Sequence, residues 1–192
     1  MSVDSKVKKI KGELDSLQKN MDSRLDEYPD EQISLLACEE ALHAVMEGNY
    51  GVGCVLLGPS GDVVLKGHNR VFYPYFRSDL HAEMVVMNLF EDSHQDLSDM
   101  SGYVLHCTLE PCPMCLARLI ASRIGTVKYV APDVDGGMIH QADQIPKNFL
   151  RLAKNQSFIQ SKSSPDIRRL AFEIFLVNID ELREKLFERL PV

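Results

Sequence analysis

The 192-residue sequence has no long apolar run, and this absence argues against a membrane protein. No stretch approaches the ~18 uninterrupted apolar residues of a transmembrane helix, so we expect no membrane span and no membrane partner. The lysines near the N-terminus are not followed by an apolar segment, so we expect no secretory signal either. The apolar share of 45% and the charged share of 26% are those of a soluble globular protein with a substantial core.

Cysteine and positive charge are also limited. Five cysteines is an odd number, and without a secretory signal they indicate reduced thiols or metal ligands in a cytoplasmic protein rather than a disulfide framework. The 21 Lys and Arg residues are outnumbered by 28 Asp and Glu residues, which leaves a net charge of −7. Because nucleic-acid-binding proteins usually carry a basic face, this balance favours a small substrate over RNA, although a local basic patch can oppose the total.

Residues 1–29 are predicted to form an N-terminal helical arm. Apolar side chains recur there at helical spacing and give a thin stripe: Ile10, Leu14, Leu17, Met21 and Leu25. Such a stripe suits a helix that lies on the domain or pairs with a second copy of itself, and a solvated arm is the alternative. Tyr28-Pro29-Asp30 then ends the arm.

Residues 30–192 are assigned to one domain with a C-terminal helical region. Apolar periodicity predicts helices over 31–48, 80–90, 113–122, 147–153 and from 165 onward, with a break near 178–180. Short apolar runs bounded by turn residues predict strands over 51–57, 63–67, 103–108, 126–131 and 157–160. Alternating strands and helices of these lengths predict an α/β fold with helices on both faces of a sheet.

Two short motifs indicate the chemistry. His81-Ala82-Glu83 is followed, 28 residues after Glu83, by Pro111-Cys112-Pro113-Met114-Cys115. Pro113 suits the first position of a helix, where its missing N–H costs nothing. Cys112 is therefore predicted at the helix cap and Cys115 about one turn further, with both sulfurs able to reach one ion. The positive end of the helix dipole favours thiolates at both positions.

His81 is expected at the entrance of its own helix, because residues two apart in a helix interior face different ways. With His81, Cys112 and Cys115 as ligands, one zinc ion per chain keeps a fourth position for water, and an open position is typical of a catalytic zinc. Zinc would lower the pKa of that water to ~7. Glu83 is then a catalytic carboxylate that binds no metal and moves the protons of that water.

Two alternative interpretations explain less. A Cys-x-x-Cys pair can be a redox pair, but that would leave His81-Ala82-Glu83 without a purpose. A structural zinc site would need a second ligand pair, and none has suitable spacing.

The chain over about residues 31–140 resembles the cytidine deaminase-like superfamily of zinc-dependent deaminases, in both motifs and in the order of its elements. The His-Ala-Glu form is similar to guanine, cytosine, tRNA adenosine and deoxycytidylate deaminases. The resemblance implies a three-layer α/β/α sandwich with a central mixed sheet, a homodimer, and hydrolysis of a cyclic amidine C–N bond with release of ammonia. It also implies that Asn69 hydrogen-bonds the substrate and that backbone groups near Ala82 and Cys112 help to hold the amine carbon. The arm and the region beyond about residue 136 have no clear counterpart.

We therefore predict a zinc-dependent hydrolytic deaminase that acts on a small nucleobase or nucleoside. The first alternative is a tRNA-specific adenosine deaminase, which must receive a flipped base and bind phosphates. The second is a non-catalytic zinc-binding partner subunit, against which the presence of Glu83 argues. Contacts within the pocket decide which base is accepted, and the fold does not specify them.

Several other side chains have two interpretations. Asn69 either contacts the substrate or caps the hairpin, and Asp133 and Asp135 either touch the substrate or, more in keeping with their context, form a turn. An aromatic loop can stack on a base or cover a dimer surface: Phe72, Tyr73, Tyr75 and Phe76. Core positions are expected for the remaining cysteines and one histidine: Cys38, Cys54, Cys107 and His106. No role is assigned to the other histidines: His43, His68, His94 and His140.

Overall fold

The fold is built on a five-stranded mixed sheet, described by a computed structural model over residues 2–189. The strands are β1 (Gly53–Leu57), β2 (Val63–His68), β3 (Val104–Leu109), β4 (Thr126–Ala131) and β5 (Ser157–Gln160). Their order is β2-β1-β3-β4-β5. β1 is antiparallel to both of its neighbours, whereas β3, β4 and β5 are parallel to one another. The predicted mixed sheet is therefore confirmed.

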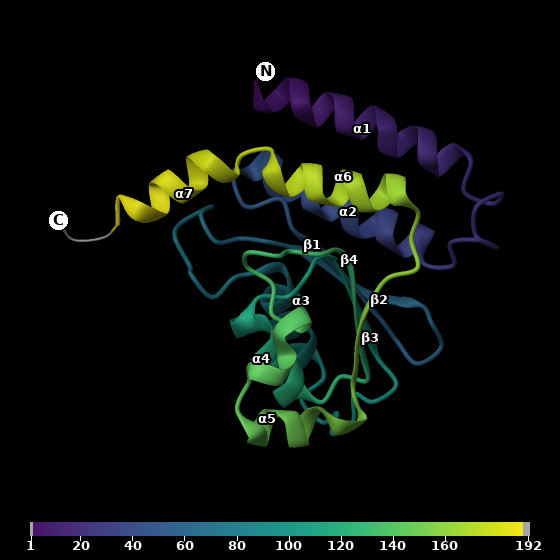
Figure 1. The fold of residues 1–192 in the computed structure, drawn as a ribbon, viewed down its shortest axis with the longest axis vertical. Helices are drawn as coiled ribbons and strands as arrows, with labels where there is room; N and C mark the ends of the chain where they lie inside the picture. Colours follow the sequence, from purple (N-terminus) through teal and green to yellow (C-terminus); the bar gives the residue numbers. More distant parts are fainter. Residues whose placement is uncertain (1, 190–192) are drawn as a thin grey trace.

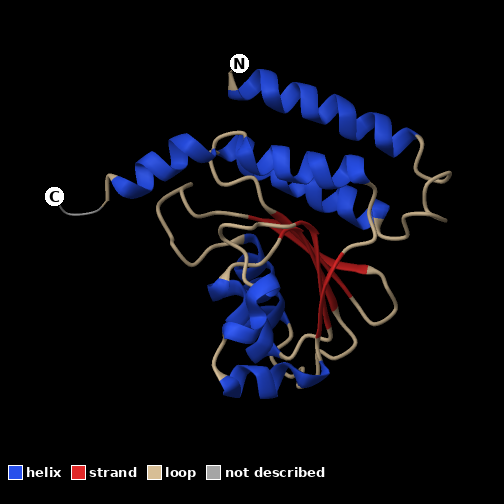
Figure 2. Ribbon diagram, viewed as in Figure 1, coloured by secondary structure: helices blue, strands red, loops and turns tan. Residues whose placement is uncertain are grey.

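Helices cover both faces of this sheet (Figures 1 and 2). One layer holds α2 (Glu31–Glu47) and α6 (Pro165–Leu176), with α1 (Val3–Lys19) lying outside them. The other layer holds α3 (Ala82–Ser93), α4 (Pro113–Ser122) and α5 (Lys147–Leu152). α7 (Ile179–Phe187) continues from α6, and two 3₁₀ helices, η1 (Ile139–Gln144) and η2 (Ala153–Asn155), flank α5. The architecture is the predicted three-layer α/β/α sandwich.

The sheet and α2 pack closely because small residues meet at their contact. α2 buries a face of alanine, cysteine and leucine side chains against the sheet, and it ends at Gly48 in the left-handed conformation with φ of 88°. β1 is buried on both faces. A Cβ atom on Gly53 would lie 2.2 Å from the Ala37 carbonyl oxygen and 2.5 Å from the Ala41 nitrogen, so only glycine allows this approach. The expected core cysteines, Cys38, Cys54 and Cys107, are all buried.

Polar side chains at the start of α2 hold the segment that leads from β5 to α6. Asp30 accepts hydrogen bonds from the Lys162 backbone N–H at 2.8 Å and from Lys128 Nζ at 2.7 Å. The buried Glu31 carboxylate accepts from the Ser164 backbone N–H at 2.8 Å and from its hydroxyl at 2.7 Å. These bonds fix where α6 begins, on the face of the sheet that α2 also covers.

His106 belongs to the same buried region, as predicted. Its Nε2 lies 2.8 Å from the Ser34 hydroxyl, and the residue is only 1% exposed. Burial lowers the pKa of His106 to about 4, so the ring is neutral at physiological pH.

α1 packs on α2 and α6 and joins the hydrophobic core through Val7, Ile10 and Leu14. Lys6 Nζ donates to the Val177 carbonyl oxygen at 3.1 Å, which ties the helix to the junction of α6 and α7. The apolar stripe predicted for the arm is thus used within the chain, but α1 ends at Lys19, so Met21 and Leu25 of the predicted helical stripe lie beyond the helix. Within residues 2–189, no helix is both long and apolar enough to cross a bilayer.

Candidate active site

The candidate site is a cavity of about 280 Å³ at one edge of the sheet. Its lining includes Asn69, just after β2, Cys112, after β3, and Asp133, after β4. β3 and β4 are parallel, so their carboxyl ends meet at this edge, where ligands bind in open α/β sheets. The start of α3 supplies His81 and Glu83 to the same cavity.

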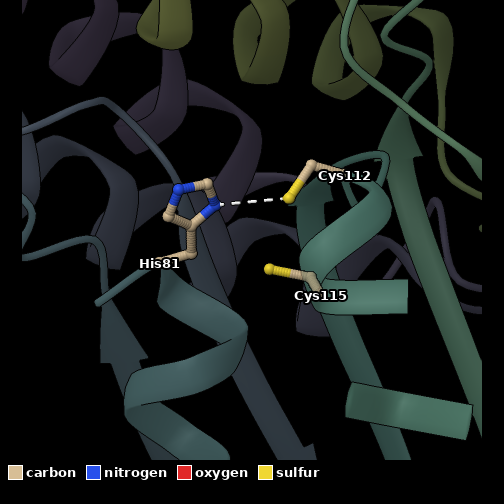
Figure 3. Close-up of side chains that lie close together, drawn as sticks. All are labelled: His81, Cys112 and Cys115. Atoms are coloured by element: carbon tan, nitrogen blue, oxygen red, sulfur yellow. Dashed lines mark hydrogen bonds between the residues drawn. The ribbon is translucent and has the colours of Figure 1, made fainter. Parts of the chain in front are cut away.

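His81, Cys112 and Cys115 converge beside this cavity (Figure 3). Their ligand atoms all lie within 4.8 Å of one another, and His81 Nδ1 is 3.5 Å from Cys112 Sγ. His81 and Cys112 are the N-cap residues of α3 and α4, both with extended backbone, and Pro113 opens α4. The two helix starts therefore aim their side chains at one point, as the two motifs predict.

Of the two thiols, Cys112 is prepared for metal binding, whereas the hydrogen bond to Cys112 and burial raise the pKa of Cys115 in the absence of a metal ion. The neighbouring Cys115 thiol and the His81 ring lower the pKa of Cys112 to about 4, against the effect of its burial. Thiolate sulfur and imidazole nitrogen are the donors that zinc prefers, and three protein donors leave a fourth position for water. The donor set therefore fits the one zinc ion per chain that the sequence predicts, with His81, Cys112 and Cys115 as the residues able to hold it.

Glu83 lies in the first turn of α3 and lines the cavity without joining this trio. It is 4% exposed, and burial raises the pKa of its carboxyl group. Ala82, between the two functional side chains, is fully buried. His81 is still extended while Glu83 is already helical, which explains how residues two apart reach the same cavity.

Asn69 makes the turn contact considered for it and also lines the cavity. Its side-chain oxygen accepts a hydrogen bond from the Val71 backbone N–H at 3.1 Å, which is the expected turn contact. Asn69 is 2% exposed and lines the cavity, and its amide nitrogen has no hydrogen-bond partner among the described residues. That nitrogen is therefore a donor available to a ligand.

Glu110 holds the loop that follows β4. One of its oxygens accepts from the His140 backbone N–H and Nδ1, both at 2.8 Å, and the other accepts from the Asp133 backbone N–H at 3.2 Å. Asp133 in turn accepts from the backbone N–H groups of Asp135 and Gly136, at 3.3 and 3.0 Å. The predicted turn role of Asp133 is confirmed. Glu110 and His140 had no predicted role, since nothing in their local pattern shows that they pair.

The C-terminal helices supply a wall that the sequence analysis did not predict. Phe175 of α6 and Ile179 and Arg183 of α7 line the cavity together with Tyr50, which follows α2. Phe175, Ile179 and Arg183 are four residues apart, a spacing that indicates one face of a helix. This pattern alone does not distinguish a helix face that lines a cavity from one that packs in the core.

The aromatic loop is a second layer around this wall. Phe72 contacts Tyr50 and Phe76 with ring centroids 5.3 and 5.6 Å apart, whereas Tyr73 and Tyr75 are exposed. None of the loop's four aromatic side chains is among the described residues that line the cavity. The loop therefore supports Tyr50 rather than forming the wall itself.

Known proteins share this combination of fold and motifs. Residues 27–131 match the family described as the cytidine and deoxycytidylate deaminase zinc-binding region. A tRNA-specific adenosine deaminase of Bacillus subtilis is 35% identical over 103 residues, which cover 53% of this chain and 61% of that protein. The chain therefore matches less than two thirds of that relative's length.

Solved structures agree on the fold. A structure from a study of A-to-I editing by tRNA:A34 deaminases superposes with a TM-score of 0.60 at 25% identity, covering 74% of this chain and 98% of that one. A guanine deaminase from Nitrosomonas europaea superposes with a TM-score of 0.53 at 21% identity, covering 76% of this chain and 81% of that one. The matched region contains both metal-binding motifs and Glu83. The chain belongs to the zinc-binding cytidine and deoxycytidylate deaminase family, whose fold it has.

Proposed function

We propose that the chain is a zinc-dependent hydrolytic deaminase of a small nucleobase or nucleoside. The observation that carries this proposal is the cavity of about 280 Å³ lined by Glu83, His81 and Cys112, with Cys115 completing the trio beside it. That volume lies near the lower end of small-molecule sites, which span about 300–1,000 Å³. Phe175 of α6 and Ile179 and Arg183 of α7 also line the cavity and restrict its size.

The side chains of the site have separate roles in the proposed reaction. His81, Cys112 and Cys115 would hold the zinc ion, which would supply a water of lowered pKa for attack on the amine-bearing carbon of the substrate. The Glu83 carboxylate takes a proton from the attacking water and delivers it to the adjacent ring nitrogen, while the water oxygen forms its bond to the amine-bearing carbon. When the C–N bond breaks, Glu83 transfers the second proton to the departing nitrogen, so that an amine and a water become a carbonyl and ammonia. Asn69 and the backbone near Ala82 and Cys112 orient the base.

The test is ammonia release from cytosine, adenine, guanine and their nucleosides and nucleotides by the zinc-loaded protein. We expect turnover of at least one compound. A complete lack of ammonia from the panel, in protein that contains zinc, would refute the proposal.

A tRNA-specific adenosine deaminase is the second candidate, and the 35% identity to the Bacillus subtilis relative favours it. Binding to tRNA must neutralise phosphates and therefore weakens steeply with salt, whereas this chain has a net charge of −7. Salt-sensitive tRNA binding with inosine formation, and no turnover of the small-molecule panel, would decide for this candidate. The third candidate, a non-catalytic partner subunit that only binds zinc, does not require a carboxylate such as Glu83 in the cavity.

A further inference from the structure

A second group of metal-ligating side chains lies outside the candidate active site, where the C-terminal half of α2 packs on β2. It consists of Glu40 and His43 on α2 and of His68, the last residue of β2. One ligand atom from each side chain lies within 4.8 Å of the other two, the same limit that describes the trio in the active site. The proposed reaction uses none of these three residues.

The arrangement follows from one face of α2 and one end of β2. Residues three and four apart are neighbours on a helix surface, so Glu40, His43 and Glu47 follow one another along α2. The His68 ring faces this row, with its Nδ1 2.9 Å from Glu40 Oε2 and its Nε2 3.1 Å from Glu47 Oε2. The helix and the strand therefore each bring a histidine to the same carboxylate.

His43 is the member of this group that the protein itself does not use. Over residues 2–189, no hydrogen bond or ion pair joins its side chain to another residue, although its ring centroid is 6.2 Å from that of His68. The residue is exposed, whereas Glu40 is buried and His68 is half-buried. A ring nitrogen of His43 is therefore available to a ligand that arrives from solvent.

The charge of the group favours a cation. Lys66 Nζ lies 3.3 Å from Glu40 Oε1 and leaves Oε2 to the side of His68. Two carboxylates, Glu40 and Glu47, thus face one lysine, and net negative charge remains when the histidines are neutral.

We propose that Glu40, His43 and His68 form a second metal site, which binds a divalent transition-metal ion such as Zn²⁺. Imidazole nitrogen and carboxylate oxygen are donors that zinc accepts, whereas Ca²⁺ and Mg²⁺ prefer oxygen ligands. Glu47 accepts a hydrogen bond from His68 Nε2–H and leaves Nδ1 to the ion, as a carboxylate commonly does for a ligating histidine. The ion takes the place of the proton that otherwise joins His68 to Glu40, so the ion pair and the metal site are alternative states of the same side chains.

This site differs from the active site in strength and in what it connects. It has no thiolate ligand, it is partly exposed, and Lys66 repels the ion. We therefore expect it to be empty after isolation without added metal and to fill when zinc is added in excess. The ion would join α2 to β2 directly before Asn69, which lines the active-site cavity.

The experiment uses the full chain with Cys112→Ser, which removes a ligand of the active-site zinc, so that the second site is measured alone. Calorimetry follows the binding of Zn²⁺. The absorption of bound Co²⁺ then identifies the ligands, because thiolates give charge-transfer bands that nitrogen and oxygen ligands do not. His43→Asn, Glu40→Gln and Lys66→Gln are made in this background, and urea unfolding checks that each variant is folded. Elemental analysis of the wild-type chain counts zinc before and after the addition of excess metal.

We expect the wild-type chain to take up a second zinc ion, and the Cys112→Ser protein to bind Co²⁺ without thiolate bands. His43→Asn and Glu40→Gln should each weaken Zn²⁺ binding by at least about 10-fold, since even the loss of a residue that only orients a ligand costs about 10- to 100-fold. Lys66→Gln should strengthen binding, because it removes a competing cation. His94→Asn, which changes an exposed histidine at the end of α3, is the matched control and should bind zinc as its parent does.

A Cys112→Ser protein that binds no Zn²⁺ would overturn the inference, as would equal binding by this protein and its His43→Asn and Glu40→Gln variants. Thiolate bands that account for all of the bound Co²⁺ would also overturn it, since the ion would then be at Cys115. Ammonia release enters none of these measurements, so the second site and the proposed function succeed or fail separately.

Discussion

His81 and Glu83 lie two residues apart, and the chain conformation between them determines their separate roles. The N-cap position of His81 turns its ring toward Cys112, while Glu83 projects from the first helical turn into the cavity. A helix that began one turn earlier would place the two side chains about 200° apart around its axis. The roles predicted for His81 and Glu83 require a helix start at this position, and the structure has it.

Glu83→Gln should abolish ammonia release while the protein keeps its zinc. The amide has nearly the same shape but cannot accept and return a proton, and general acid–base catalysis contributes about 10²- to 10⁴-fold. Metal analysis and turnover on the same preparation check both halves of this prediction. Loss of zinc together with activity would instead make Glu83 a ligand and contradict its role as proton carrier.

His68 makes a pH-dependent contribution to stability. Its Nδ1 and Nε2 lie 2.9 and 3.1 Å from carboxylate oxygens of Glu40 and Glu47. The hydrogen bond to Glu40 raises the pKa of His68 above its usual value near 6.5, against the effect of burial. The folded protein thus keeps this proton at a pH where the unfolded chain has lost it. The stabilisation is complete below about pH 6.5 and disappears as the pH rises through the folded-state pKa.

His68→Asn should therefore lower the free energy of unfolding more at pH 6 than at pH 8.5, by up to about 1 kcal/mol for ion pairs of this exposure. Urea unfolding at the two pH values measures the difference. In a Glu40→Gln background the pH dependence should shrink, because the stronger of the two partners is gone. An identical effect of His68→Asn at both pH values would contradict this assignment.

At the scale of single elements, β1 and α2 depend on a glycine contact that allows no side chain. Gly53→Ala should destabilise the protein, because the new methyl group would lie 2.2 Å from the Ala37 carbonyl oxygen, and overpacking of this kind costs about 1–3 kcal/mol or more. Gly12→Ala in α1 is the matched control. It has open space around its Cβ position and should be stabilising by roughly 0.5–1 kcal/mol.

Denaturant midpoints of the two variants measure this contrast. Equal midpoints for wild type and Gly53→Ala would show that α2 can move away from β1 at little cost. Destabilisation by Gly12→Ala would show that α1 does not have the helical conformation described here.

The helices and strands could be predicted from the sequence because residues within or next to each element signal where it begins or ends. Pro113 set the start of α4 and Gly48 the end of α2, and the structure has both boundaries. The site ligands were predicted for the same reason, since each motif lies within one helix start. The helix expected over 80–90 begins at Ala82 instead, because His81 caps it with extended backbone.

Contacts between distant segments were not predicted, because no local pattern encodes them. Glu110 and His140 are 30 residues apart, and their pairing depends on the turn formed by Asp133. Asn178 and Asn49 are 129 residues apart, and their bond requires the junction of α6 and α7 to lie beside the C-terminal end of α2. The walls of the cavity come from such contacts, so the chemistry was readable from the sequence while the substrate-facing surface was not.

At the scale of the whole molecule, the metal-binding motifs and one wall of the cavity come from different parts of the chain. Residues 27–131 match the family and contain the metal-binding motifs. The wall formed by Phe175, Ile179 and Arg183 comes from the C-terminal helices, which the buried start of α2 positions. The apolar stripe of α1 is buried against α2 and α6. The homodimer that we propose by family resemblance therefore needs a surface other than this stripe.

Zinc should stabilise the whole fold as well as the reaction, because its ligands join two helices that are far apart in sequence. A ligand at 100 times its Kd stabilises the folded state by about 2.7 kcal/mol. For a domain of this size each kcal/mol shifts Tm by about 2–4 °C, so removal of zinc should lower Tm by roughly 5–10 °C. Thermal unfolding of chelator-treated and zinc-reloaded protein measures this shift, and ammonia release should vanish and return with the metal.

Cys112→Ser is the matched control, since its Tm should respond little to chelator. A wild-type Tm that chelator leaves unchanged, in protein shown to have lost its zinc, would mean that α3 and α4 hold their positions without the ion.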